Sequence, residues 1–226
     1  MSPETHDAEQ LRLRNRELTI LNTVATTLNR SDDLTRALET TLAAVVQAFD
    51  LRTSWVWLLN EQAGEFYLAA SVHLPPALLR PNRMEGWCHC RELYAAGEMD
   101  TAANIGIIQC TRLKDLVDGT EGLRAHASVP LDAHGKRVGI LNVVSHDWRE
   151  LSDADLRLLT TIGHMLSIAV ERARLFTRSA TLGAAEERVR LAREIHDTLA
   201  QGLSATALQL ETADAPSANV PDPEPA

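Results

Sequence analysis

Four short runs of β-branched, aromatic and leucine residues constrain the fold of this chain more than any other feature. They cover residues 53–59, 66–72, 126–131 and 137–145. Turn-like segments join them in pairs, the first ending at Gly64 and the second at Gly135. Two such pairs predict two β-hairpins. In the first run Trp55 and Trp57 alternate with a valine, so both indoles are expected on one face of the strand.

A polar helix with a narrow apolar seam is predicted over residues 8–30. The seam consists of apolar residues three, four or seven positions apart, namely Leu11, Leu18, Leu21, Ala25 and Leu28. A stripe this narrow favours a two-stranded coiled coil over a helix packed on a globular core. A second helix is expected from the acidic start at Asp32 and Asp33 to about Phe49.

A longer helix is predicted after the second hairpin. Ser152 and Asp155 resemble a capping box, and apolar residues then alternate three and four positions apart. The helical pattern extends to about Thr212, although Gly183 could interrupt it. Residues 213–226 contain four prolines among Ala, Asp and Glu, so a disordered tail is expected there.

Composition excludes several classes of partner. The net charge is −9, no run of Lys and Arg stands out, and Phe 3, Trp 4 and Tyr 2 leave few rings for base stacking. Nucleic acid is therefore not expected as a partner. No 18 apolar residues run together and the first residues do not resemble a secretory signal, so we expect no membrane span and a cytoplasmic location.

Three cysteines, Cys88, Cys90 and Cys110, fall within 23 consecutive positions. Thiolates bind zinc, Cu(I) and iron–sulfur clusters, so the group is a candidate metal site. The C-x-C spacing differs from the usual C-x₂-C of zinc sites, and no fourth cysteine exists. A fourth ligand would have to be His89, His73, His126 or a group outside the chain.

Two other interpretations of the cysteines stay open. Cysteines often fill small apolar gaps in the core of a cytosolic protein. Alternatively, a C-x-C pair flanked by His89 and Arg91 could have a lowered thiol pKa and undergo reversible oxidation.

The order of predicted elements over residues 33–172 resembles a GAF domain, the ligand- or cofactor-sensing relative of PAS. The segments that carry the resemblance are the leading helix, the runs 54–59, 126–131 and 139–144, and the closing helix around 155–159. This resemblance implies an α+β fold, a GAF/PAS-like central antiparallel sheet flanked by helices. The cysteine pattern also resembles GAF domains that hold an iron–sulfur centre and respond to oxygen, which would make Cys88, Cys90, Cys110 and His89 cofactor ligands.

Residues 187–203 read ERVRLAREIHDTLAQGL and closely resemble the H-box of the nitrate-sensor-type (HisKA_3) sensor histidine kinases. The resemblance implies that His196 is the phosphoacceptor, that Asp197 assists its phosphorylation, and that Gln201 positions water for dephosphorylation of a regulator. Glu194 adds a second carboxylate beside the imidazole. His196 lies one position, about 100°, off the apolar stripe of Leu191, Ile195, Leu199 and Leu203, and should therefore face solvent.

The combined prediction has four parts: an N-terminal coiled-coil helix (1–30), a GAF sensor domain (31–178), an H-box dimerisation and phosphoacceptor helix (179–212) and the tail (213–226). We expect the input and phosphoacceptor part of a cytosolic two-component sensor histidine kinase. Its expected partners are a second copy in a homodimer, a response regulator receiver domain, and a small-molecule or redox signal.

No ATP-binding motif is present in the sequence, so ATP is expected only through a catalytic domain absent from this chain, which is either shortened or a kinase remnant. The alternative function is a GAF-type thiol enzyme similar to methionine sulfoxide reductases, which would use the cysteines as nucleophiles. Such an enzyme does not need an H-box helix, so the flanking helices favour the sensor.

Overall fold

The computed structural model describes the backbone of residues 3–30, 33–106, 110, 112–113, 123, 125–145 and 150–213. Side chains are described over the same ranges apart from residues 3–6, 9, 125 and 197–213. The chain divides into two compact units, Met1–Arg174 and Leu175–Ala226.

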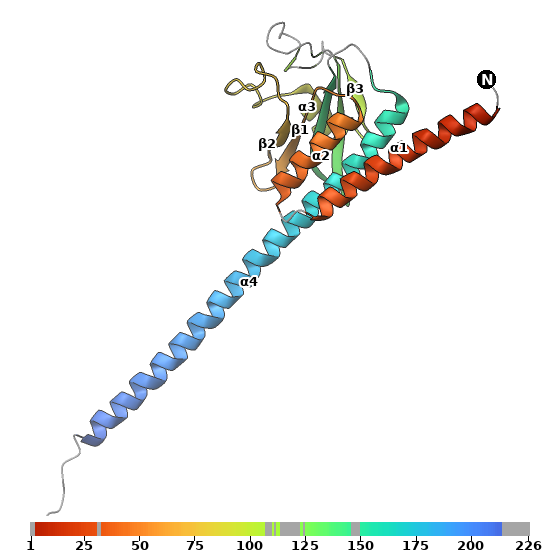
Figure 1. Ribbon diagram of the computed structural model, residues 1–226. Coiled ribbons are helices and arrows are strands. Elements are labelled where there is room, and N and C mark those ends of the chain that lie inside the picture. The colour runs from red at the N-terminus through yellow and green to blue at the C-terminus, as the bar shows by residue number, and fades with distance from the viewer. Residues whose placement is uncertain are drawn as a thin grey trace, which may run out of the picture. The chain divides into compact units, whose positions relative to one another are not determined.

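A five-stranded antiparallel sheet forms the centre of the first unit, with strand order β2-β1-β5-β4-β3 (Figure 1). The elements are α1 (Pro3–Arg30), α2 (Leu34–Ala48), β1 (Thr53–Asn60), β2 (Glu65–Val72), α3 (His89–Ala96), β3 (Ala103–Ile105), β4 (Ala125–Ala133), β5 (Lys136–Ser145) and α4 (Asp153–Ala213). The predicted α+β fold is confirmed, and so are both hairpins.

The hairpin turns follow the backbone preferences of their residues. His134 and Gly135 connect β4 to β5 with φ values of 51° and 74°, the left-handed conformation at both central positions of a two-residue turn. Gly64, at φ 68°, closes the turn between β1 and β2, and its N–H donates to the Asn60 carbonyl over 2.8 Å.

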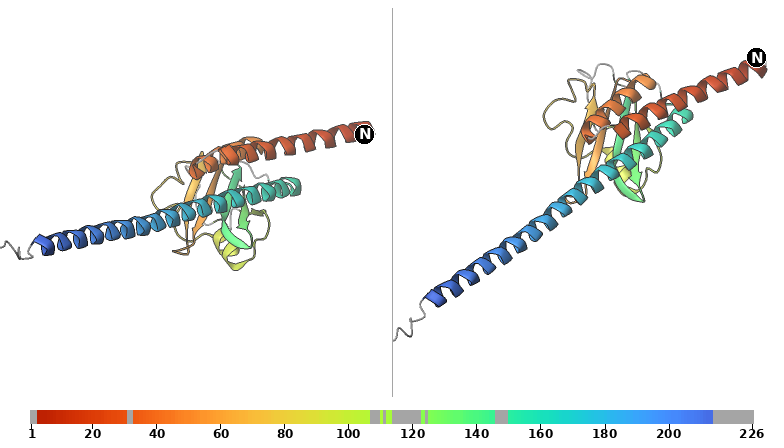
Figure 2. Two further views of the ribbon diagram at one scale, coloured as in Figure 1. Left: turned by 90° about the horizontal axis from the view of Figure 1, so that it is seen from below. Right: turned by 60° about the horizontal axis from the view of Figure 1, so that its bottom comes forward.

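The two faces of the sheet are covered by different elements. Helices α1, α2 and the first turns of α4 cover one face, which we call the helix face, and α3 lies against the other, which we call the thiol face (Figure 2). Strand β1 contributes to both: Val56 and Leu58 belong to the core on the helix face, whereas Trp55 and Trp57 belong to a separate cluster on the thiol face. The prediction that the two tryptophans share a face is confirmed.

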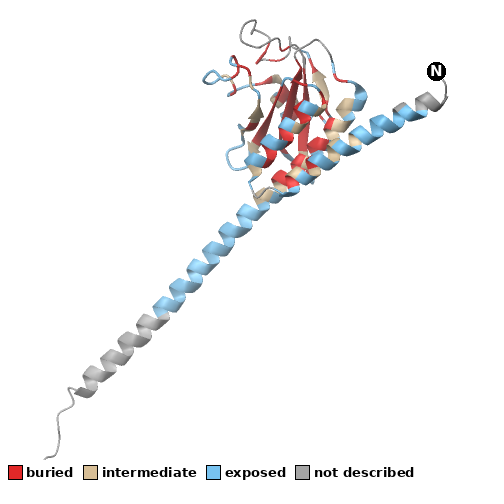
Figure 3. Ribbon diagram, in the orientation of Figure 1, coloured by how far each residue is buried: buried red, intermediate tan, exposed pale blue. Residues whose placement is uncertain are grey.

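Helix α1 is only partly free of the core. Val24 and Leu28 are buried, and the Arg172 guanidinium of α4 donates to the Leu28 carbonyl over 2.9 Å. Leu11 and Leu18, by contrast, are more than 60% exposed, and the burial colours show this change along the helix (Figure 3). The expectation of a seam held away from the core was wrong for the last turns of α1, because Leu28 is part of the core that α2 and α4 form on the helix face.

Two further details differ from the sequence prediction. No helix or strand was predicted between the two hairpins, but this segment contains the helix α3 and the strand β3. Helix α4 continues through Gly183 without an interruption, since one glycine costs only about 1 kcal/mol in a helix interior.

Within the described residues no helix has both the length and the apolar character needed to cross a bilayer.

Candidate functional site

Cys88 and Cys90 lie at the start of α3 on the thiol face. Cys88 is the N-cap residue in an extended conformation, and its carbonyl accepts the N–H groups of Arg91 and Glu92 over 3.0 and 3.1 Å. The helix ends at Gly97, whose φ of 79° provides the left-handed C-cap. Both cysteines are buried, at 4% and 1% exposure. This local geometry presents two thiols to the sheet rather than to solvent.

The two thiols form a hydrogen-bonded pair, and a histidine of the sheet contacts it. The hydrogen bond from Cys90, assisted by the nearby Arg112 guanidinium, lowers the pKa of Cys88 to about 5, while the same bond and burial raise the pKa of Cys90. The Cys90 Sγ lies 3.2 Å from Nε2 of His126 on β4. Burial, reinforced by the charge of His89, lowers the pKa of His126 to about 4, so its imidazole is neutral near pH 7.

Cys110 is buried as well, but it packs in a different apolar cluster. It lies with Trp55 and Trp57, whereas Cys88 and Cys90 pack with Met99 and Ile105. Burial raises the pKa of Cys110 to about 11, so this thiol stays protonated near neutral pH. Of the predicted cysteine-site residues, Cys88 and Cys90 are brought together as a pair, and Cys110 interacts with both electrostatically. His126 supplies an imidazole that contacts Cys90.

The cysteines of the thiol face and His89 were predicted as ligands of a metal. Among the residues whose positions are described, no group of three or more His, Cys, Asp or Glu side chains is arranged to hold a metal ion. The thiols of Cys88 and Cys90 are engaged with each other, and the cationic guanidinium of Arg112 acts on the pair. Within the described residues the geometry provides no set of ligands for a thiolate-bound metal or iron–sulfur cluster, and such a centre stays a prediction.

Two arginines that the sequence analysis missed lie against the thiol face. The Arg112 guanidinium stacks 4.8 Å from the centre of the Trp57 ring, and that of Arg91 lies 5.5 Å from the same ring and 4.7 Å from the ring of Phe66. Arg112 is only 3% exposed. It donates to the backbone carbonyls of three residues: Arg83, Glu85 and Gly86. Nothing in the short stretch around Cys110 indicates from sequence that Arg112 is buried.

Tyr94 anchors α3 to the hairpin of β4 and β5. Its hydroxyl lies 2.7 Å from the Leu131 carbonyl and 2.8 Å from the Asp132 carboxylate, and it accepts the Val138 N–H over 3.0 Å. Burial and the Asp132 carboxylate raise the pKa of this phenol. The helix that carries Cys90 is thereby tied to the strands beside it.

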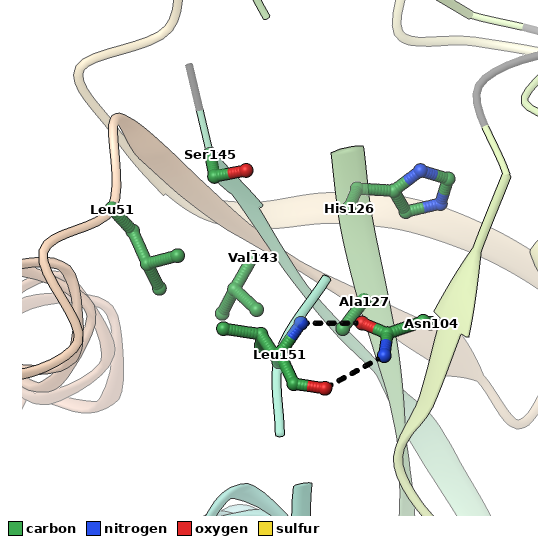
Figure 4. Close-up of a pocket in the computed structure, with 7 residues that line it drawn as sticks. All are labelled: Leu51, Asn104, His126, Ala127, Val143, Ser145 and Leu151. Atoms are coloured by element: carbon green, nitrogen blue, oxygen red, sulfur yellow. Dashed lines mark hydrogen bonds between the residues drawn. The ribbon is translucent and has the colours of Figure 1, made fainter. Parts of the chain in front are cut away.

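A shallow depression lies at the end of the sheet where β3, β4 and β5 meet (Figure 4). The Asn104 amide accepts the Leu151 N–H over 3.1 Å and donates to the Leu151 carbonyl over 2.9 Å, which closes one side. The His126 ring borders the depression, so this imidazole lies between the thiol pair and the end of the sheet.

The second unit carries the predicted phosphoacceptor residues on α4. His196 and Glu194 are exposed, and the Glu194 carboxylate lies 3.1 Å from the Arg190 guanidinium, which also pairs with Glu187 at 2.8 Å. Asp197 and Gln201 belong to the helix, but their side chains lie outside the described residues.

The two described residues of the apolar stripe beside His196 are exposed in this single chain. Leu191 is 43% exposed and Ile195 is 58% exposed, so the second unit leaves these side chains uncovered. His196 is exposed too, and because the described stripe residues are equally exposed, its predicted place off the stripe stays a prediction.

Comparison with known proteins gives two family matches. The model of the GAF domain family matches residues 31–171, and the histidine kinase model HisKA_3 matches residues 187–224. The sensor histidine kinase YhcY of Bacillus subtilis (strain 168) is 33% identical over 207 residues. That alignment covers 88% of this chain and 54% of YhcY, so the chain spans about half the length of this curated relative.

Among the solved structures that share this fold, two come from different kinds of protein. The GAF domain of a phosphoenolpyruvate-protein phosphotransferase from Coxiella burnetii aligns with a TM-score of 0.59 and 18% identity, over 72% of this chain and 97% of that one. The free methionine-R-sulfoxide reductase from Neisseria meningitidis aligns with a TM-score of 0.52 and 18% identity, over 70% and 90%. At these identities the similarity establishes the fold alone.

Proposed function

Because the chain belongs to the GAF domain family and carries a HisKA_3 histidine kinase region, we propose that it is the sensory and phosphoacceptor part of a two-component sensor histidine kinase. In this proposal His196 accepts the γ-phosphoryl group of ATP bound to a catalytic domain and passes it to an aspartate of a receiver domain. The observation that carries the proposal is the exposed imidazole of His196, on a helix, within the matched kinase region.

The chemistry required of this residue agrees with its surroundings. A phosphoacceptor imidazole must be accessible to two large partners in turn, and His196 is exposed on α4. Glu194 pairs with Arg190 one turn earlier, and the adjacent Asp197 of the H-box is the carboxylate that we propose takes up a proton from the imidazole. Gln201 lies one helical turn beyond Asp197, where it would position water for dephosphorylation of the receiver.

Helix α4 supplies the connection from sensor to acceptor in this proposal. Its first turns bury Leu159, Ile162 and Leu166 in the core on the helix face, and the same helix carries His196. A signal that alters packing in the sheet core can therefore bias α4 between two arrangements. The exposed side chains of Leu191 and Ile195 support pairing of this helix with that of a second copy, because burying them would gain hydrophobic free energy.

The thiol pair supports a redox signal as the input. A thiolate at Cys88 is the reactive form of a cysteine, and Cys90 is hydrogen-bonded to it, so an oxidant could convert the pair to a disulfide. Oxidation would change the start of α3, which Tyr94 ties to β4 and β5. The same pair is the feature that favours the alternative thiol-reductase function, and turnover of free methionine sulfoxide with a thiol reductant would support that alternative.

Phosphorylation in trans tests the main proposal. The full chain is incubated with radiolabelled ATP and a separately purified catalytic domain of a HisKA_3 kinase, and we expect a label that acid removes and base does not. His196→Gln should abolish the label. His164→Gln serves as the control, since His164 is an exposed imidazole of the same helix and should leave labelling unchanged. Equal labelling of the chain and of His196→Gln would remove the assignment.

A further inference from the structure

The thiol face contains an unusual surplus of hydrogen-bond donors. Several buried nitrogens on this face have no hydrogen-bond partner: Nε1 of Trp55, Nε1 of Trp57, Nδ2 of Asn142 and Nε of Arg112. Trp55 lies opposite Asn142 in the pairing of β1 with β5, and Arg112 stacks on Trp57, so the four groups belong to one neighbourhood. Each buried donor without an acceptor costs roughly 1–3 kcal/mol, and native proteins contain few of them.

The imbalance has a direction, because the two indole N–H groups, the Asn142 amide and Nε of Arg112 are all donors, and the one further ring nitrogen without a partner, Nδ1 of His126, is a donor or an acceptor according to the tautomer. The oxygens that lack partners among the described residues belong to other elements, Thr41 of α2 and Glu171 of α4. On the thiol face the side-chain oxygen of Asn142 already has a partner, because it accepts a hydrogen bond from the Ser128 hydroxyl over 2.8 Å. On the thiol face, donors without a partner therefore outnumber the acceptors that are free to receive them.

Positive charge accompanies these donors. Arg112 is 3% exposed, and the hydrogen bonds that its guanidinium makes within the described residues go to backbone carbonyls. Arg91 adds a second guanidinium over the Trp57 ring. Among the described residues the Cys88 thiolate acts on both guanidinium groups, and the Glu65 carboxylate acts on Arg91. Burying the cation of Arg112 is unfavourable unless negative charge accompanies it, so an anion beside this guanidinium would be stabilised.

We propose that the thiol face is a binding site for a small oxyanion, an organic carboxylate or an inorganic equivalent, held by Arg112 and the indole N–H groups of Trp55 and Trp57. Oxygen acceptors of such a ligand satisfy donors that the chain leaves without partners, and a planar guanidinium pairs well with two oxygens. The Asn142 amide provides a further donor from β5. The inference deepens the proposed sensor function by naming the class of signal, and it rests on that function only in calling the ligand a signal.

Binding is tested on the full chain with sodium formate, acetate and sulfate, each titrated against chloride at constant ionic strength. Isothermal calorimetry gives the dissociation constant, and thermal unfolding gives an independent readout. At a concentration one hundred times the dissociation constant, a ligand that binds only the folded chain should raise the unfolding midpoint by roughly 5 °C or more. A preference for formate and acetate identifies a carboxylate, and a preference for sulfate identifies an inorganic oxyanion.

A pair of conservative variants localises the site. Trp57→Phe keeps an aromatic ring under Arg112 but removes the N–H donor together with part of the indole, so the affinity should fall roughly tenfold or more, as expected for the loss of a hydrogen bond to a charged acceptor. Trp87→Phe is the control, because Trp87 is 59% exposed, and its affinity should not change. The proposal is overturned if none of the three anions stabilises the chain beyond chloride, or if both variants bind as the parent does. Phosphorylation of His196 is not part of this measurement, so either idea can fail without the other.

Discussion

Replacement of His126 should remove a defined part of the pH dependence of stability. The imidazole is 3% exposed, and burial lowers its pKa from 6.5 to about 4 in the folded chain. Between these two values the unfolded chain binds a proton that the folded chain does not. The stabilising contribution is therefore complete above pH 6.5 and is lost as the pH falls through 4.

The magnitude follows from the difference between the two pKa values. A shift from 6.5 to about 4 corresponds to roughly 3 kcal/mol, which is a large share of the 5–15 kcal/mol typical of a folded domain. Carboxylates and the Cys88 thiol also titrate over this range, so the parent chain alone cannot isolate the effect. The useful quantity is the loss in free energy of unfolding between pH 7 and pH 4, compared between the parent and His126→Gln.

Urea unfolding followed by indole fluorescence measures this quantity, because Trp55 and Trp57 lie in the same unit as His126. The Gln variant keeps an amide that can contact Cys90, and any pH-independent destabilisation cancels in the comparison. We expect the variant to lose about 3 kcal/mol less than the parent between the two pH values. His134→Asn, at an exposed turn position that suits Asn, should lose as much as the parent. Equal losses in the parent and His126→Gln would refute the reasoning.

Three further substitutions test local features of the structure. Urea unfolding measures the first and the third, and circular dichroism measures the second. Gly139→Ala should destabilise the chain by roughly 3 kcal/mol or unfold it, because the new Cβ would lie 2.1 Å from the Trp57 carbonyl oxygen; a loss below 1 kcal/mol would contradict the close packing. Gly183→Ala has open space in α4 and should raise helix stability by up to about 1 kcal/mol, seen as increased helical ellipticity. Tyr94→Phe should cost roughly 1–3 kcal/mol, because the buried Val138 N–H loses its acceptor, and an unchanged midpoint would argue against this anchor.

The parts of the fold that local patterns determine could be predicted from the sequence. Alternation in β1 placed Trp55 and Trp57 on one face, and Gly135 marked the turn of the second hairpin, because strand faces and tight turns depend on neighbouring residues.

The thiol face could not be predicted in the same way, since it depends on contacts between distant segments. Helix α3 has eight residues and starts at Cys88, whose side chain makes no capping hydrogen bond, so its sequence contains no ordinary helix-start signal. Pairing of β4 with β5 brings His126 to Cys90 from 36 positions away, and Arg112 reaches Trp57 across the chain. The identity of the imidazole beside the thiols was therefore open from sequence alone.

The alternation of β1 has a consequence for how related chains can diverge. Substitutions at Trp55 or Trp57 change the chemistry offered to a signal, whereas substitutions at Val56 or Leu58 change the packing under the helices. Because the two sets project to opposite sides of one strand, mutational tolerance should differ between odd-numbered and even-numbered positions. We expect selection to diversify specificity at the first set while conserving hydrophobic volume at the second, so that new sensors arise without loss of the scaffold.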